Sequence, residues 1–170
     1  RVLVSAESFR IPQVILFNKK DLLNEKEVDA LEHVLTLYQS IGVLTESISA
    51  QQDESIEMVE KILQGKVTLI AGHSGVGKST LLNRLSPDFK QSTGAISDFS
   101  EKGTHTTTFA EMLKVNTSTF IIDTPGIKEW GLVNMDQQEI SDYFPEMRSL
   151  RLECKFGSRC LHINEPKCAI

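Results

Sequence analysis

The sequence has no long hydrophobic run and few glycines, prolines and cysteines. Its apolar runs are only a few residues long, which excludes a hydrophobic membrane-spanning helix. Ten glycines and five prolines among 170 residues exclude a collagen-like repeat and do not indicate a disordered chain. The three cysteines all lie in the last 17 residues, which is not the distribution of a disulfide framework. We therefore expect a reducing, cytoplasmic location and no association with membranes.

Apolar residues make up 40% of the 170 residues, enough to form the core of one compact domain. The formal net charge of -5 argues against a protein whose whole surface binds nucleic acid. A local basic patch is compatible with this net charge. We expect a monomer. Because the first residue is Arg1 and not Met, we also expect the sequence to be part of a longer chain.

Short apolar runs alternate with stretches of helical periodicity, which is the pattern of βαβ units. This alternation predicts an α/β fold with a mostly parallel sheet and helices on both faces. The expected strands are 14–17, 67–71, 120–122 and an edge strand at 109–115, and the expected helices are 24–41, 54–63 and 80–85. The periodicity fades from about residue 145, which predicts a domain of residues 1–144 and a small module of residues 145–170.

A glycine-rich segment follows the strand expected at 67–71 and matches the P-loop pattern in full. Glycines in such a loop let successive backbone N–H groups point at phosphate oxygens, and the helix that follows adds its positive dipole end. Lys78 would reach the β- and γ-phosphates and the Ser79 hydroxyl would bind Mg²⁺. The alternative is a glycine-rich turn with an ordinary surface lysine. The expected nucleotide contacts are Gly72, His73, Ser74, Gly75, Val76, Gly77, Lys78, Ser79 and Thr80.

The polar residues after the first expected strand indicate which base is bound. Open α/β sheets bind ligands at the carboxyl ends of their strands, where Asn18, Lys19 and Asp21 would lie. The Asp21 carboxylate can accept hydrogen bonds from N1–H and the 2-amino group of guanine, whereas adenine has neither donor. Asn18 can bridge the purine and the phosphate loop, and the Lys19 stem can lie over the ring. The backbone at Ser49 and Ala50 can contact guanine O6. The alternative is a polar turn that caps a helix.

Two further segments are candidates for the γ-phosphate and Mg²⁺. Asp123 follows the buried strand expected at 120–122 and can hold Mg²⁺ through a water. The N–H of Gly126 can approach the γ-phosphate because no Cβ blocks it. A threonine-rich segment before Asp123 offers a hydroxyl of Thr106 or Thr107 to complete the Mg²⁺ shell, and a solvated loop is the alternative.

In chain order, the base-recognition motifs come before the P-loop, the threonine-rich segment and the Asp-x-x-Gly motif. This is the order of a circularly permuted GTPase. With the Gly-x-His-Thr-Thr segment at 103–107 and the cysteine-rich tail, it resembles the RsgA (YjeQ) family, bacterial GTPases that act on the small ribosomal subunit during its assembly. The resemblance implies GTP or GDP, Mg²⁺ and Zn²⁺ as ligands, and the small ribosomal subunit and its rRNA as partners. It also implies an N-terminal OB-fold and a C-terminal helix beyond this chain.

The tail reads Cys154-x5-Cys160-x-His162-x5-Cys168, and its three thiols and imidazole suffice for a tetrahedral zinc site. It has no Cys-x-x-Cys pair, so reduced cysteines without metal are the alternative; the resemblance implies zinc. Residues 148–170 carry five basic and two acidic residues. This local excess of positive charge indicates RNA contact only weakly, and ordinary surface charge is the alternative. Because the Asp-x-x-Gly segment leads directly into the tail, a movement of that segment on hydrolysis would reach it.

No glutamine follows the Asp-x-x-Gly motif to orient the attacking water, since residues 127–129 are Ile, Lys and Glu. His105 is the nearest candidate with both donor and acceptor capacity, and Lys78 is the second catalytic candidate. Some relatives bind a catalytic K⁺ with an asparagine where this chain has Gly75, so potassium dependence is not predicted. We expect a GTP hydrolase that cleaves the γ-phosphoanhydride bond and is stimulated by the small subunit. The alternatives are a P-loop ATPase or kinase, and a nucleotide-stabilised zinc RNA-binding module without catalysis.

Overall fold

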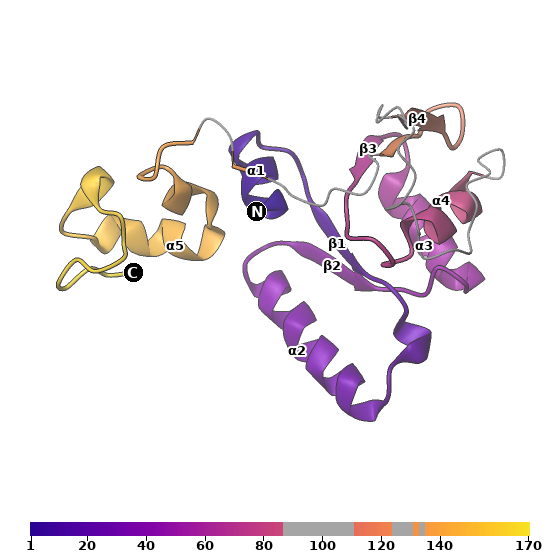
Figure 1. The fold of residues 1–170 in the computed structure, drawn as a ribbon, viewed down its shortest axis with the longest axis horizontal. Coiled ribbons are helices and arrows are strands. Elements are labelled where there is room, and N and C mark those ends of the chain that lie inside the picture. Colours follow the sequence, from indigo (N-terminus) through magenta and orange to yellow (C-terminus); the bar gives the residue numbers. More distant parts are fainter. Residues whose placement is uncertain (87–110, 124–130, 133–134) are drawn as a thin grey trace, which may run out of the picture. The chain divides into compact units, whose positions relative to one another are not determined.

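The computed structural model describes residues 1–86, 111–123, 131–132 and 135–170 (Figure 1). The chain forms two compact units. The P-loop unit comprises Phe17–Asn24 and Ser47–Lys128, and the tail unit comprises Arg1–Leu16, Glu25–Glu46 and Glu129–Ile170. In the ranges described, no helix is long and apolar enough to cross a bilayer.

Three strands of the P-loop unit form one sheet, in the order β3 (Val67–Ile70), β5 (Phe120–Asp123), β4 (Glu111–Lys114). β3 and β5 run parallel, with Ile70 opposite Asp123, so the carboxyl ends of the two strands lie side by side. β4 is antiparallel to β5 and lies at the sheet edge, as its alternating sequence predicts.

Two helices of the same unit, α3 (Asp53–Leu63) and α4 (Lys78–Leu85), contact each other. On α3, Ile56, Val59 and Leu63 are buried at the spacing of one helical face. Leu82 of α4 and Ile121 of β5 are completely buried. This apolar core supports the loop between β3 and α4 and the end of β5, where the sequence predicts phosphate and Mg²⁺ binding.

In the tail unit, α1 (Val2–Ser8) is followed by β1 (Val14–Phe17), α2 (Glu25–Ser40) and β2 (Leu44–Ser47). β1 and β2 form a two-stranded sheet and extend by their last residues into the P-loop unit. β1 and α2 match the elements expected at 14–17 and 24–41, whereas β2 was not expected. Between β1 and α2, the short 3-10 helix η1 (Lys20–Leu22) belongs to the P-loop unit.

The C-terminal part of the tail unit consists of short helical segments around few buried side chains. Its elements are η2 (Ile140–Tyr143), α5 (Pro145–Leu150), η3 (Arg151–Glu153) and η4 (Gly157–Arg159). α1 contacts η2, and Arg148 of α5 donates a hydrogen bond to Glu7 of α1 at 2.5 Å. Among the described side chains of residues 145–170, only Cys154 and Cys160 are buried. This segment therefore has almost no apolar core of its own.

Candidate functional site

The P-loop connects β3 to the first turn of α4. Gly75 and Gly77 both adopt left-handed backbone conformations, with φ of 79° and 96°, which only glycine takes up without strain. Gly77 is the N-cap of α4, and its carbonyl oxygen accepts the N–H of Leu81 at 3.0 Å. The free N–H groups at the start of α4 and the turn before it form the kind of backbone cradle that binds phosphate.

The Lys78 side chain folds back along this loop. Its ammonium donates hydrogen bonds to the carbonyl oxygens of Gly72 and His73, the latter at 3.0 Å. The positive charge therefore lies against the carbonyl oxygens of the loop. Ser79 and Thr80 follow in the first turn of α4, so the predicted phosphate-binding residues share one loop and one helix start.

The Asn18 side chain joins two segments that are distant in sequence. Its Nδ2 donates to the carbonyl oxygen of Val76 in the P-loop at 2.9 Å, and its Oδ1 accepts the N–H of Ala50 at 2.9 Å. A Cβ added at Gly77 would collide with Asn18 Nδ2. The predicted base-binding and phosphate-binding segments are thus in direct contact through one amide group.

The segment with Ser49 and Ala50 is held by several further contacts. Ser49 is buried, and its N–H donates to Ser55 Oγ of α3 at 3.0 Å. From the end of α4, Arg84 pairs with Asp53 and donates to the carbonyl oxygen of Gln51 at 3.1 Å. The sequence did not predict a role for Arg84, because a single arginine at the end of a helix gives no indication of its partner.

Two predicted base-binding residues lie in the turn after β1. Lys19 has a left-handed φ of 73°, and Asp21 lies exposed in η1. The turn is fixed by backbone hydrogen bonds to Ile48, whose carbonyl oxygen accepts the N–H of Lys20 at 3.0 Å and whose N–H donates to Phe17 at 2.8 Å. The turn and the segment before Ala50 therefore form one backbone-bonded structure.

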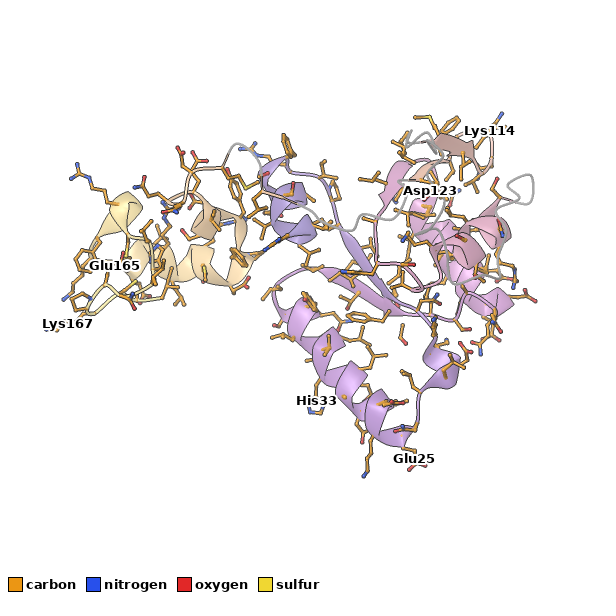
Figure 2. All side chains as sticks on the ribbon, in the orientation of Figure 1. Glu25, His33, Lys114, Asp123, Glu165 and Lys167 are labelled. Atoms are coloured by element: carbon orange, nitrogen blue, oxygen red, sulfur yellow. The ribbon has the colours of Figure 1, made fainter. Side chains whose placement is uncertain are left out.

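Asp123 is the last residue of β5 (Figure 2), and it is buried. It lies opposite Ile70, the residue at which β3 ends before the P-loop begins. This is where a Mg²⁺ ligand beside the phosphates is expected. The remaining predicted contacts, His105, Thr106, Thr107 and Gly126, lie outside the described residues.

The four predicted zinc ligands come together in the tail unit. Their ligand atoms all lie within 4.8 Å of one another. The Sγ atom of Cys168 lies 3.8 Å from that of Cys154 and 3.7 Å from that of Cys160, and none of the three cysteines forms a disulfide. In a tetrahedral site with Zn–S bonds of about 2.3 Å, two sulfurs are about 3.8 Å apart. The spacing of the thiols therefore fits Zn²⁺.

The imidazole of His162 completes this cluster. Its Nδ1 lies 3.0 Å from Cys168 Sγ, so Nδ1 is the nitrogen that faces the thiols. Its Nε2 is buried and has no hydrogen-bond partner among the described residues. The donor set of three sulfurs and one nitrogen is one that Zn²⁺ commonly has in structural sites.

The two buried thiols differ in acidity. The backbone N–H of Phe156 lowers the pKa of the Cys154 thiol below its ordinary value, whereas burial raises the pKa of the Cys160 thiol to about 12. A thiolate at Cys160 is thus unfavourable without a nearby cation, and a divalent metal would supply that charge.

Glu165 lies between His162 and Cys168 in sequence, and the sequence motifs assign it no role. Its carboxylate accepts hydrogen bonds from backbone N–H groups, of which that of Leu161 has the largest effect, and they lower its pKa to about 2. A carboxylate three residues after a candidate ligand, in a short loop, is the indication that could have identified it.

Comparisons with known proteins agree on one family. A family model described as RsgA GTPase matches residues 1–133. The chain is 46% identical over 170 residues to small ribosomal subunit biogenesis GTPase RsgA 2 of Bacteroides thetaiotaomicron, covering 100% of this chain and 54% of the relative. It is 47% identical to the corresponding RsgA of Azobacteroides pseudotrichonymphae, covering 100% of this chain and 55% of that protein. The chain therefore spans about half the length of these curated relatives.

Two solved structures have a similar fold. YjeQ from Thermotoga maritima matches with a TM-score of 0.79 and 31% identity, covering 99% of this chain and 54% of that one. YloQ, described as a circularly permuted GTPase, matches with a TM-score of 0.74 and 30% identity, covering 99% of this chain and 52% of that one.

Proposed function

The chain belongs to the RsgA GTPase family, and from this membership and the geometry of the P-loop unit we propose that it is a Mg²⁺-dependent GTP hydrolase. The observation that carries the proposal is the double hydrogen bond of Asn18, to Val76 and to Ala50. It joins a phosphate-binding loop to a segment suited to a purine, so one nucleotide can contact both.

We assign guanine recognition to two segments that Asn18 brings together, the turn after β1 that contains Asp21 and the loop that contains Ser49 and Ala50. Asp21 would accept hydrogen bonds from N1–H and the 2-amino group. The backbone at Ser49 and Ala50 is the proposed contact of O6, which would share or replace the bonds that these N–H groups donate to Ser55 Oγ and Asn18 Oδ1 in the structure. A site built to pair such polar groups rejects a base that lacks them. Such selectivity for guanine, measured as the preference for GTP over ATP, would exclude the alternative of an ATPase or kinase.

We assign the phosphates to the P-loop and Lys78, as its sequence pattern and its backbone geometry support. Ser79, Thr107 and Asp123 are the residues we propose to hold Mg²⁺, which when bound would stabilise charge on the β- and γ-phosphates. In the reaction, a water oxygen attacks the γ-phosphorus while the bond to the β–γ bridging oxygen breaks, releasing GDP and phosphate. We propose that His105 orients this water, and that Thr106 and Gly126 contact the γ-phosphate side.

We further propose that residues 145–170 form a zinc-stabilised module that follows a GTPase domain of residues 1–144 in the chain and is bonded to its first helix through Arg148 and Glu7. Cys154, Cys160, His162 and Cys168 would hold the metal. Because the two buried side chains described in this module are thiols of that cluster, the metal would take the place of an apolar core.

The proposed partner is the small ribosomal subunit with its rRNA. The names of the relatives carry this proposal, since they are described as small ribosomal subunit biogenesis GTPases. The excess of basic residues in 148–170 is compatible with rRNA contact. We propose that the protein acts as a monomer in the cytoplasm.

The test is the rate of GTP hydrolysis by the full-length protein, measured with and without purified small subunits, with ATP as the competing substrate and Lys78→Ala as the inactive control. We expect slow basal GTP turnover, stimulation by small subunits, and no measurable ATP turnover. Equal use of ATP would favour the ATPase alternative. Tight GTP binding without turnover, with or without subunits, would favour the non-catalytic alternative.

A further inference from the structure

A single carboxylate organises the loop that carries His162. Glu165 Oε1 accepts the backbone N–H of Leu161 at 2.7 Å, and Oε2 accepts those of Ile163 at 2.9 Å and Asn164 at 3.1 Å. Figure 2 marks Glu165 in this C-terminal loop. Both carboxylate oxygens are therefore occupied by backbone N–H groups of three of the four residues that precede Glu165.

These bonds fix the backbone on both sides of His162. That residue has a left-handed φ of 57°, which is uncommon for a side chain other than glycine and needs support from its surroundings. In this conformation its Nδ1 lies 3.0 Å from Cys168 Sγ. The backbone carbonyl of Glu165 also accepts the N–H of Cys168 at 3.2 Å. The side chain of Glu165 thus holds one member of the thiol–imidazole cluster, and its main chain holds another.

We propose that Glu165 is a positioning residue for the zinc site, one that orients the His162 imidazole toward the thiols without binding the metal itself. This inference rests on the proposed zinc site. Glu165 is poorly available as a ligand because its two oxygens already accept three N–H groups. A loop fixed in the binding conformation loses less conformational freedom when the metal binds, which raises the affinity.

The test compares Glu165→Gln with Glu146→Gln in the purified, reduced protein, using zinc affinity measured by competition with a chelating dye. Glutamine keeps the shape of the side chain but loses its charge and replaces one acceptor oxygen with a donor. Glu146 is an exposed acidic residue of α5 in the same module, so its variant removes the same charge without touching the loop. We expect Glu165→Gln to weaken zinc binding roughly 10- to 100-fold, and Glu146→Gln to leave it unchanged. Glu165→Asp, which is shorter and reaches fewer N–H groups, should give a smaller loss.

A second measurement separates positioning of the imidazole from general loosening of the module. In a His162→Ala background, Glu165→Gln should weaken zinc binding by less than about threefold, because the side chain that it orients has already been removed. A residue that only supports folding of the module would cause the full loss in both backgrounds, and that result would overturn the positioning role.

The remaining outcomes distinguish this inference from the zinc proposal. If the unaltered protein holds one zinc and Glu165→Gln binds it as tightly as Glu146→Gln does, the zinc site stands and the role of Glu165 is refuted. If the unaltered, reduced protein takes up no zinc when zinc is supplied, the zinc site is refuted and the role of Glu165 with it.

Discussion

Asn18 and Val76 lie 58 residues apart in sequence, and a hydrogen bond of 2.9 Å joins the amide of the first to the carbonyl oxygen of the second. The same amide accepts the N–H of Ala50. A displacement of the Asn18 side chain would therefore disturb both sides of the proposed nucleotide site, the base side and the phosphate side.

Replacing Asn18 with alanine removes both hydrogen bonds. We expect roughly 10- to 100-fold weaker binding of a fluorescent GDP analogue, because two bonds worth about 0.5–1.5 kcal/mol each are lost where the site must be ordered. Asn116→Ala is the matched control, since the Asn116 side chain likewise forms two hydrogen bonds with the backbone, accepting the N–H groups of Ser118 and Thr119 in the turn between β4 and β5. It should lower the free energy of unfolding and leave nucleotide affinity intact. Similar nucleotide affinities for the two variants would contradict the bridging role of Asn18.

A methyl group at Gly77 would meet the Asn18 amide and would also strain a backbone with φ of 96°. We expect Gly77→Ala to weaken GTP binding at least tenfold in calorimetry. Gly65→Ala is the control that strains the backbone without a steric collision, because Gly65 has a φ of 70° and open space around it. That control should cost about 1 kcal/mol of stability without loss of GTP affinity. A normal GTP affinity for Gly77→Ala would show that close contact with Asn18 is not required.

Exchanging Asp21 for asparagine should change which base is preferred. Xanthine has an acceptor where guanine has its 2-amino donor, and the asparagine amide can donate to it. We expect GTP affinity to fall at least about 100-fold and xanthosine triphosphate affinity to rise. The same two affinities should be unaltered in Asp29→Asn, a substitution on helix α2. An unchanged order of preference in Asp21→Asn would refute its role in base recognition.

Loss of one proposed zinc ligand should separate metal binding from nucleotide binding. Elemental analysis should find about one zinc per chain in the unaltered protein and none in Cys160→Ser. GTP affinity should stay within about twofold, because the nucleotide residues and the cysteine cluster belong to different compact units. Stimulation of hydrolysis by small subunits should fall more than the basal rate, since the tail follows the Asp123 segment in the chain. A disulfide among the three cysteines after reducing purification would contradict this prediction.

The motif order predicted a permuted α/β GTPase fold, and the match to YjeQ and YloQ confirms it. Motifs with fixed spacing are predictable because the chemistry of the phosphate loop fixes residue types. β2 was not predicted, because its buried position is occupied by Thr45, a polar residue. The strand therefore lacks the alternation of apolar and polar residues that indicates a strand. The roles of Arg84 and Glu165 were not predicted either. Each acts on backbone groups, and a sequence does not reveal which carbonyl or N–H a charged side chain will meet.

The Asn18 bridge also bears on the order of events while the chain is being synthesised. Its partner N–H at Ala50 is added 32 residues after Asn18, and its partner carbonyl at Val76 is added 58 residues after it. At about 5–20 residues per second, the second partner follows the first by roughly one to five seconds. The proposed base-binding segments around Asn18 and Ala50 are thus synthesised before the P-loop. In a GTPase whose P-loop comes first in the chain, the order is reversed. The proposed nucleotide site of a nascent chain is incomplete until Val76, and after it Lys78 and Asp123, have been added.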